Sequence, residues 1–338
     1  MRTTRTPVRE EEQGARAPPA GVPHARHAAE LSKLTPRVGT APPMKRLRRW
    51  LMKRWIARRP LQTFHVAAKH LGVTGIEIRV PPTSPLHRAG VAETVELPLD
   101  DIIASVVLRT GAWQPEELAF LEAHAPEGPC VLVDVGAHVG LVTRQARHRL
   151  PTIQASVSFE PHPHHFARLQ RNLAHLPHAH LVNAALDVVS GERTLREDEG
   201  NSGNCSFHPE FLADARTRTH VVRCVAATEA SILGPLPAPL ADAPLLWKSD
   251  TQGCDEALMA ALPDTFWARV HAGLMELSRI DRPAVERERL GTVLAGFDVR
   301  RFTDAPDRDV SVAEILEFVT GRDGRQRDLG FARRRTTR

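Results

Sequence analysis

The sequence predicts an α/β fold in which helices pack on a parallel sheet, and two observations carry this prediction. The first is a short β-branched run, Val131 to Val135, which leads into a glycine turn at Gly136 and Gly140 and then into a helical segment. The second is the series of apolar runs that follows, beginning with Ile153 to Phe159, because each run alternates with a segment of helical composition. Such alternation is typical of strands joined by helical crossovers.

The start of the chain differs in composition from the rest. Residues 1–43 are rich in Arg, Pro, Ala and His and carry few large apolar side chains, so we expect them to be disordered. Residues 44–59 place Leu47, Leu51 and Trp55 at helical spacing among basic residues, which indicates a basic amphipathic helix. Such a helix packs either on its own domain or on an anionic membrane surface, and both alternatives stay open.

Charge and cysteine usage narrow the class of protein. The formal net charge is +5, and much of the excess lies at the two ends of the chain. The four cysteines show no C-x-x-C pairing, which argues against a zinc site and a disulfide framework and favours the cytoplasm. The sequence has no apolar run of about 18 residues and no apolar signal-peptide core, so neither a membrane span nor a secretory signal is expected.

Residues 60–129 are expected to form a cap ahead of the main sheet and to contribute contacts to a substrate. Two short strand-like runs, 76–80 and 93–97, precede a helical stretch from Asp101 to Leu108. A second helix is expected to begin near Pro115, because proline suits the first turn of a helix.

The glycine turn indicates a small-molecule site. Gly136 and Gly140 allow backbone to approach a ligand closely, and the helix that follows offers free N–H groups at its start. The pattern is D-x-G-x-x-x-G, which differs from the G-x-G-x-x-G of dinucleotide sites and lacks the G-K-[ST] of a phosphate-binding Walker loop. NAD, FAD and nucleoside triphosphates are therefore disfavoured.

The second strand ends at Glu160, about twenty residues after Gly140. At this position an α/β nucleoside site holds the carboxylate that binds the ribose hydroxyls. The alternative is a helix cap, since an acidic residue before a proline and a helix is common. The glycine turn upstream favours the ribose role.

The remaining elements are expected in the order strand, insertion, strand, helix, strand, helix and strand. We assign residues 130–320 to the core and 321–338 to a basic C-terminal tail. The expected ranges are a strand at 180–186, short strands within 191–225 interrupted by a turn at 200–204, a strand at 245–250 ending in Asp250, a helix at 253–262, a strand at 270–277 carrying Glu276, a helix at 284–295 and a strand at 296–302.

Several motifs together resemble one known family. VDVGAHVG, FEPHP, NAAL, the Asn-Ser-Gly turn, KSDTQGCDEALMAAL and LMELS follow the order and spacing of the FkbM-type methyltransferases, over roughly Asp100 to Phe302. The resemblance implies a class I methyltransferase (Rossmann-like) fold. That fold is a seven-stranded, mostly parallel sheet with an antiparallel last strand and helices on both faces, here with an N-terminal helical cap. It also implies S-adenosylmethionine as cofactor and O-methylation of a hydroxyl on a sugar, a glycan or a secondary metabolite.

The resemblance assigns roles to particular residues. Asp250 is the first candidate for the base that takes the acceptor's proton, a contribution of about 10²–10⁴-fold, and His138 and Glu276 are the next candidates. Three positions depart from the family: His138 replaces the usual Asn, and Gln252 and Asp255 replace two frequent glutamates. The implied cofactor-binding residues are Asp134, Gly136, Ala137, His138, Gly140, Glu160 and Ala185.

Three alternatives stand beside this interpretation. The basic ends suggest a nucleic-acid methyltransferase, but the chain has no tyrosine and few aromatic residues for base stacking. The departures at His138 and Gln252 suggest a non-catalytic binding protein. The run His162-Pro-His164-His165 suggests a metal site, but ligands at this spacing at the start of a helix are not expected to converge, so we interpret these histidines as solvated surface and expect no metal.

Overall fold

The computed structural model describes residues 73–99, 102–212 and 216–334, which belong to one compact unit spanning Arg59–Arg338. The expected disordered segment 1–43 and the expected amphipathic helix 44–59 lie outside the described residues. Among the described residues, no helix combines the length and the apolar character that a membrane crossing requires.

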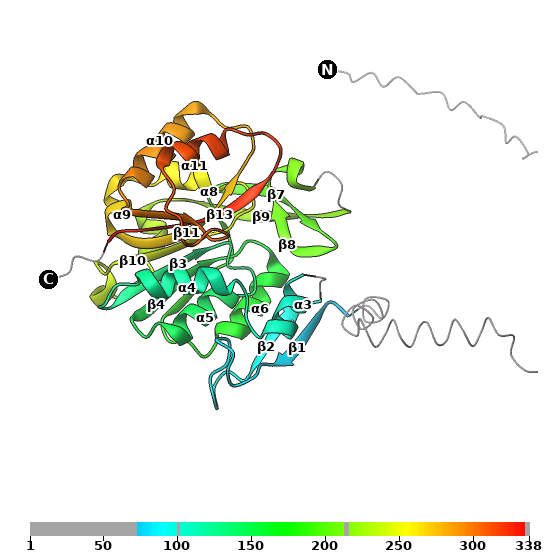
Figure 1. The fold of residues 1–338 in the computed structure, drawn as a ribbon. Coiled ribbons are helices and arrows are strands. Elements are labelled where there is room, and N and C mark those ends of the chain that lie inside the picture. Colours follow the sequence, from blue (N-terminus) through cyan, green and yellow to red (C-terminus); the bar gives the residue numbers. More distant parts are fainter. Residues whose placement is uncertain (1–72, 100–101, 213–215, 335–338) are drawn as a thin grey trace, which may run out of the picture. The chain divides into compact units, whose positions relative to one another are not determined.

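A seven-stranded sheet forms the centre of the fold (Figure 1). Its strand order is β12-β13-β11-β10-β3-β4-β5, and β13 runs antiparallel to both of its neighbours while the other pairs run parallel. This confirms the mostly parallel sheet with an antiparallel last strand. The strands are β3 (Cys130–Val135), β4 (Ile153–Phe159), β5 (Ala179–Val182), β10 (Leu245–Ser249), β11 (Val270–Ser278), β12 (Val299–Phe302) and β13 (Gln326–Ala332).

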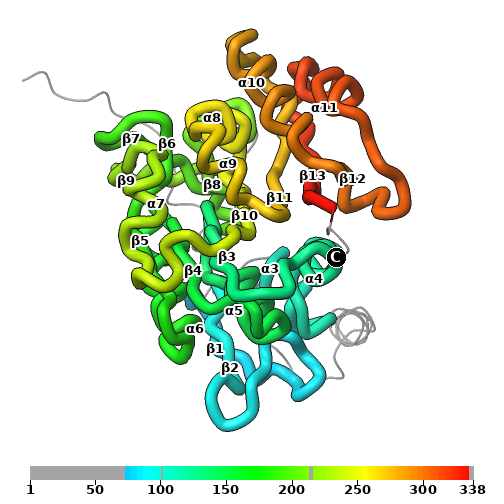
Figure 2. Tube along the Cα trace, turned by 90° about the vertical axis from the view of Figure 1, so that its left-hand side faces the viewer, coloured from blue at the N-terminus to red at the C-terminus, as the bar shows by residue number. Residues whose placement is uncertain are grey.

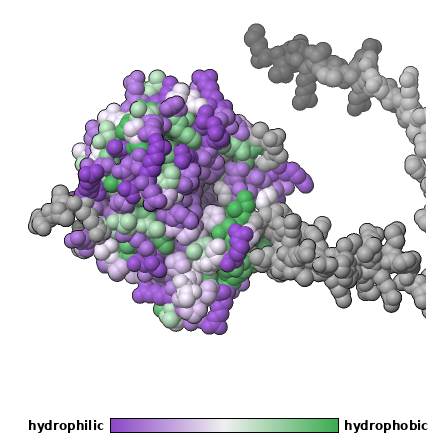
Figure 3. Space-filling view, in the orientation of Figure 1, coloured by the Kyte–Doolittle hydropathy of each residue, from purple (hydrophilic) through white to green (hydrophobic). Residues whose placement is uncertain are grey.

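Helices cover both faces of this sheet, as expected. Alternate residues of a strand point to opposite faces, so Val131 and Val133 face one core, which includes side chains of α8, α9, α10 and α11, whereas Leu132 faces a second core with α4 and α5. Hydrophilic residues predominate on the outer face seen in Figure 3. The helices are α4 (Pro115–His124), α5 (Leu141–Arg149), α6 (Pro163–Leu173), α8 (Asp255–Ala261), α9 (Asp264–Arg269), α10 (Ala284–Ala295) and α11 (Val312–Val319).

The cap region contains the two strands expected at 76–80 and 93–97, and they pair as a small sheet. β1 (Gly75–Arg79) pairs antiparallel with β2 (Thr94–Pro98), and α3 (Ile103–Thr110) follows. A buried arginine of α5 holds the loop between the two strands: Arg144 donates from Nε to the carbonyl of Leu86 over 2.7 Å and from Nη2 to that of Ala92 over 3.0 Å.

A second sheet, of four strands, is formed by the chain between β5 and β10 of the main sheet and has the order β6-β9-β7-β8. The strand predicted at 180–186 is two strands in different sheets, because the chain turns at Asn183, whose amide donates to the carbonyl of Glu160 over 2.9 Å. The turn predicted at 200–204 is largely part of β8. β7 and β9 are visible side by side in Figure 2. The strands are β6 (Ala185–Asp187), β7 (Gly191–Asp198), β8 (Asn201–Ser206) and β9 (Thr217–Ala226), and the short helix α7 (Glu229–Leu233) follows.

The expected tail at 321–338 is wrong over half of its described length, because β13 belongs to the sheet. Leu329 and Phe331 are fully buried in the core between arginine-rich flanks. Arg333 is also fixed, since its guanidinium donates to the carbonyls of Val270, Gly296 and Trp267. The basic composition of this segment thus led the sequence analysis to miss a core strand.

Candidate active site

A cavity of about 340 Å³ opens at the carboxyl ends of β3, β4 and β10. The strand order reverses between β3 and β10, because the chain builds outward from β3 to β5 and then returns to β10 on the other side. Ligands of open α/β sheets bind at such a reversal. The lining includes Gly136, Ala137, His138, Phe159, Glu160, His165, Ala185, Leu186, Ser202, Lys248, Asp250, Gln252, Glu276 and Gln326.

The glycine turn after β3 is packed directly against the chain after β10. Gly136 has φ +73°, and a Cβ added to it would lie 2.0 Å from the carbonyl oxygen of Asp250. Gly140 has φ +83° and directly precedes α5, and its Cβ would lie 2.7 Å from Leu169 Cδ1. Both positions therefore require glycine, for backbone conformation and for space.

Glu160 is held at the wall of the cavity by two backbone donors. The N–H of His138 donates to Oε2 over 2.8 Å, and the N–H of His162 donates to Oε1 over 2.7 Å. Burial raises the pKa of Glu160 to about 7, against the opposing effect of these two hydrogen bonds. Each carboxylate oxygen has two lone pairs, so each retains acceptor capacity toward a ligand.

His138 occupies the left-handed region, with φ +51°. Histidine is, with asparagine and aspartate, among the non-glycine residues that adopt this region more often than others. The His138 imidazole lies 3.3 Å from the Ser202 hydroxyl, between Nε2 and Oγ. Burial, with a smaller effect of Lys248, lowers the pKa of His138 to about 3, so the ring is neutral and is a weak base near neutral pH.

Asp250 and Glu276 are joined by two amide side chains. Gln252 Nε2 donates to Asp250 Oδ1 over 3.0 Å and to Glu276 Oε1 over 3.1 Å. Gln326 Nε2, from β13, donates to Glu276 Oε2 over 2.5 Å and to Gln252 Oε1 over 3.0 Å. Burial and the neighbouring Asp250 raise the pKa of Glu276. Gln252 thus supplies the amide donor that lies between the two carboxyl groups.

Lys248 carries a charge inside an otherwise apolar strand. Its Nζ donates to the carbonyl of Gly136 over 2.9 Å and lies 3.3 Å from Asp134 Oδ1. Burial opposes the charge, but the carboxylates of Asp134 and Asp250 outweigh it, so the pKa of Lys248 is raised. Sequence reasoning missed Lys248, although a lysine within a buried run, LLWKS, is itself a signal of a functional or paired charge.

The predicted site residues separate into two groups. Seven of them (Gly136, Ala137, His138, Glu160, Ala185, Asp250 and Glu276) line the cavity. Asp134 and Gly140 are not among the described residues that line it. Asp134 is fully buried and accepts from the Thr143 hydroxyl over 2.6 Å, so it supports the turn from behind. Asp255 likewise accepts from the Thr251 hydroxyl over 2.7 Å and fixes the loop before α8.

Two of the histidines that were interpreted as solvated surface are buried. His162 is 1% exposed and His165 is 2% exposed, whereas His164 is exposed. The rings of His162 and His165 stack with centroids 4.0 Å apart, so their side chains do converge. The first residue of this pair precedes α6 and the second lies in its first turn, which turns both rings to the same side.

No protein-family model and no curated protein matches the sequence. Among solved structures, the chain is similar to the 23S rRNA methyltransferase ErmE, with 13% identity over 66% of this chain and 69% of that chain and a TM-score of 0.32. It is similar to a precorrin-6y C5,15-methyltransferase from Geobacter metallireducens, with 12% identity over 65% of this chain and 89% of that chain and a TM-score of 0.31. It is also similar to a SAM-dependent methyltransferase of the DUF858 family from Leishmania major, with 12% identity over 69% of this chain and 78% of that chain and a TM-score of 0.31. These TM-scores are low, so the fold is assigned from the strand order of the sheet and not from these similarities.

Proposed function

We propose that this chain is a methyltransferase that binds S-adenosylmethionine in the cavity beside Glu160 and methylates a hydroxyl group of a sugar, a glycan or a secondary metabolite. The observation that carries the proposal is the geometry of Glu160. Glu160 directly follows β4, the strand that pairs with β3. Its carboxylate is fixed by two backbone N–H groups and faces the point where the strand order reverses. The order and spacing of the sequence motifs support assignment to the FkbM-type enzymes.

The residues around the cavity fit this cofactor. Glu160 offers acceptors for the two ribose hydroxyls, and Ala185, Leu186 and Phe159 offer an apolar wall for the adenine ring. The backbone at Gly136 and Ala137 would border the methionine part. When bound, S-adenosylmethionine supplies an activated methyl group on its sulfonium. The volume, about 340 Å³, is within the range of small-molecule sites, roughly 300–1,000 Å³.

Asp250 is the residue we propose to take the acceptor's proton. Its carboxylate faces the cavity, and the Gln252 amide orients it through Oδ1. His138 is a weak base because its pKa is about 3, so we assign it to the cofactor turn. Glu276, held by Gln252 and Gln326, is better suited to bind a hydroxyl or amino group of the acceptor. Positioning of donor and acceptor supplies much of the remaining acceleration.

Two further observations support the cellular location and the class of acceptor. The four cysteines are free thiols, which supports the cytoplasm. The cavity is lined by carboxyl and amide groups on its acceptor side, which suits a small polyhydroxylated molecule. The described cavity lining has Trp113 and two phenylalanines but no cluster of basic side chains, so nothing in it favours a nucleic-acid substrate.

Transfer of a labelled methyl group tests this function. The full chain is incubated with labelled S-adenosylmethionine and cell extract divided into glycan, lipid, small-molecule and nucleic-acid fractions. We expect label in the glycan or small-molecule fraction, and a loss of about 10²–10⁴-fold for Asp250→Asn. The matched control is Asp242→Asn, on an exposed loop. Label in the nucleic-acid fraction alone would contradict the proposed acceptor, and equal rates for the two variants would remove Asp250 as the base.

A further inference from the structure

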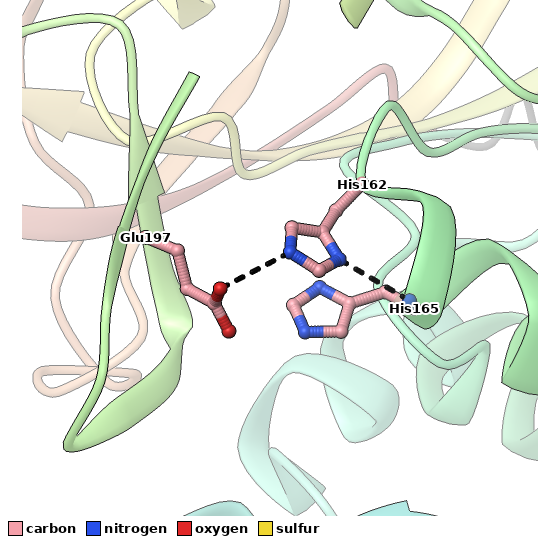
Figure 4. Close-up of side chains that lie close together, drawn as sticks. All are labelled: His162, His165 and Glu197. Carbon is pink, nitrogen blue, oxygen red and sulfur yellow. Dashed lines mark hydrogen bonds and ion pairs between the residues drawn. The ribbon is translucent and has the colours of Figure 1, made fainter. Parts of the chain in front are cut away.

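A cluster of imidazole and carboxylate groups lies beside the candidate active site and takes no part in the function proposed above. Figure 4 shows His162 and His165, at the start of α6, with their rings stacked and facing Glu197 of β7. One ligand atom from each of these three residues lies within 4.8 Å of the others. His220 of β9 adds a third imidazole, because its ring packs against that of His162 with centroids 4.3 Å apart.

Three of the four ligand atoms already have the spacing of a metal site. His162 Nε2 lies 3.1 Å from His220 Nε2 and 3.3 Å from Glu197 Oε2, and His220 Nε2 lies 3.0 Å from the same oxygen. Bonds of about 2.0–2.2 Å in a tetrahedral zinc site place neighbouring ligand atoms about 3.4 Å apart. The observed triangle needs to expand by only a few tenths of an ångström to accept the ion.

We propose that His162, His220 and Glu197, with His165 as the fourth ligand, bind a zinc ion. Three imidazoles and one carboxylate form a donor set that suits zinc and does not suit magnesium or calcium, which prefer oxygen ligands. The burial of His162 and His165 and the small exposure of the Glu197 and His220 side chains, about 16% and 15%, shield the site from water.

Binding requires several changes of hydrogen bonding. Zinc on the two Nε2 atoms would replace the hydrogen bonds that His162 and His220 make with Glu197 Oε2 and with each other. His162 Nδ1 accepts from the backbone N–H of His165 over 3.4 Å, which is a long contact. When Nε2 binds a metal, a neutral imidazole carries its proton on Nδ1, so this contact is lost. His165 also has to turn within its stack to direct a nitrogen at the ion. These adjustments are confined to side chains, and the ion–ligand bonds offset them.

The proposed ion would link two parts of the fold. His162 directly precedes α6 and His165 lies in its first turn, next to the main sheet, whereas Glu197 and His220 belong to the second sheet. The N–H of His162 also holds Glu160. Zinc would therefore fix the second sheet, which includes the cavity-lining strand β8, against the loop that carries Glu160. This consequence holds whether or not the cavity binds S-adenosylmethionine.

Metal analysis of the untagged full chain tests the proposal. The protein is stripped with a chelator, dialysed and titrated with zinc sulfate, with the bound metal measured by mass spectrometry. We expect one zinc per chain, and binding at least about tenfold weaker for Glu197→Gln and for His220→Ala. The matched control is His164→Ala, which removes an exposed histidine of the same segment and is expected to bind zinc as the wild type does.

Two further readouts distinguish a site from surface binding. Zinc is expected to raise the Tm of the wild type and of His164→Ala by the same amount, and to raise that of Glu197→Gln less, because stabilisation follows the affinity of the folded state for the ion. Cobalt is expected to give the visible absorption of a tetrahedral ion. Circular dichroism verifies that the variants are folded, and a variant that fails this criterion is replaced by His165→Asn. Less than a tenth of an equivalent of zinc in the wild type, or equal affinity for Glu197→Gln and His164→Ala, would overturn the proposal.

Discussion

Gly136 and Asp250 are in backbone contact across the two central strands of the sheet: a Cβ on Gly136 would lie 2.0 Å from the Asp250 carbonyl oxygen. The turn that we assign to the cofactor and the residue that we assign to the acceptor are therefore fixed to each other. Neither can move without the other, because no flexible side chain lies between them. Four tests of stability and one of binding follow from contacts between named residues.

Gly136→Ala is expected to disrupt the turn. The residue has φ +73°, and its new methyl group would collide with backbone at Asp250. Gly90→Ala is the matched control, because Gly90 has φ +68° but a Cβ added to it would meet nothing within 4 Å. The control is expected to lose only the conformational cost of about 1 kcal/mol. Thermal unfolding measures both, and equal losses of Tm would show that the contact with Asp250 is unimportant.

Lys248→Met is expected to destabilise the fold by about 3–5 kcal/mol, since it leaves the buried Asp134 without its partner. The double variant Lys248→Met with Asp134→Asn removes both charges and is expected to recover part of this loss. Urea unfolding of the wild type, the two single variants and the double variant forms a complete cycle. Additive losses would be incompatible with a direct ion pair.

Gln252→Glu is expected to lower stability at pH 8. A carboxylate in place of the amide would lie next to Asp250 Oδ1 and Glu276 Oε1, which now accept from Gln252 at 3.0 and 3.1 Å. Because protonation relieves repulsion between carboxylates, the difference in Tm from the wild type should shrink toward pH 5. The same Tm for both proteins at pH 8 would argue against the amide bridge.

The pair His148 and His175 predicts a loss of stability on acidification. His148 Nδ1 donates to the carbonyl of Pro85 over 3.1 Å, so its Nε2 accepts from His175 Nε2 over 2.8 Å, and both rings are neutral. Burial lowers the pKa of each to about 4, whereas an unfolded histidine titrates near 6.5. Between these values the unfolded chain binds more protons, so stability decreases as the pH falls from about 6.5 to 4.

A pH series of Tm values checks this linkage. The double variant His148→Gln with His175→Gln should lose fewer degrees than the wild type between pH 7 and pH 4.5. His164→Gln, at an exposed position, serves as the control and should follow the wild type. If the double variant and the wild type have the same pH profile, the pair does not remain neutral in the folded protein.

Periodicity in the sequence predicted the central elements well. The strand at Ile153–Phe159 and the helix at Ala284–Ala295 have the expected bounds. Apolar runs bounded by glycine or proline leave little choice of structure. The prediction of β13 failed because the strand begins with the polar residues Gln326 to Asp328 and has only a short apolar part, which a basic segment follows directly. The first arginine of that segment, Arg333, bonds backbone carbonyls instead of facing solvent.

The candidate site was predictable where its residues lie close in sequence. The turn at Gly136 and the acid at Glu160 follow from spacing alone, since consecutive parallel strands end at the same edge. Gln326 and His220 were not predictable, because strand pairing brings them to the site from distant segments. Convergence of His162 with His165 was underestimated, because one turn of helix directs both rings to the same side.

Calorimetric titration of the full chain with S-adenosylmethionine tests the central claim most directly. The wild type is expected to bind one molecule, and Glu160→Ala to bind at least about tenfold more weakly, since two ribose hydrogen bonds to a carboxylate are lost. Glu192→Ala, at an exposed position of β7, is expected to bind as the wild type does. Absence of binding by the folded wild type, or equal affinity for Glu160→Ala and Glu192→Ala, would contradict the assignment of the cavity.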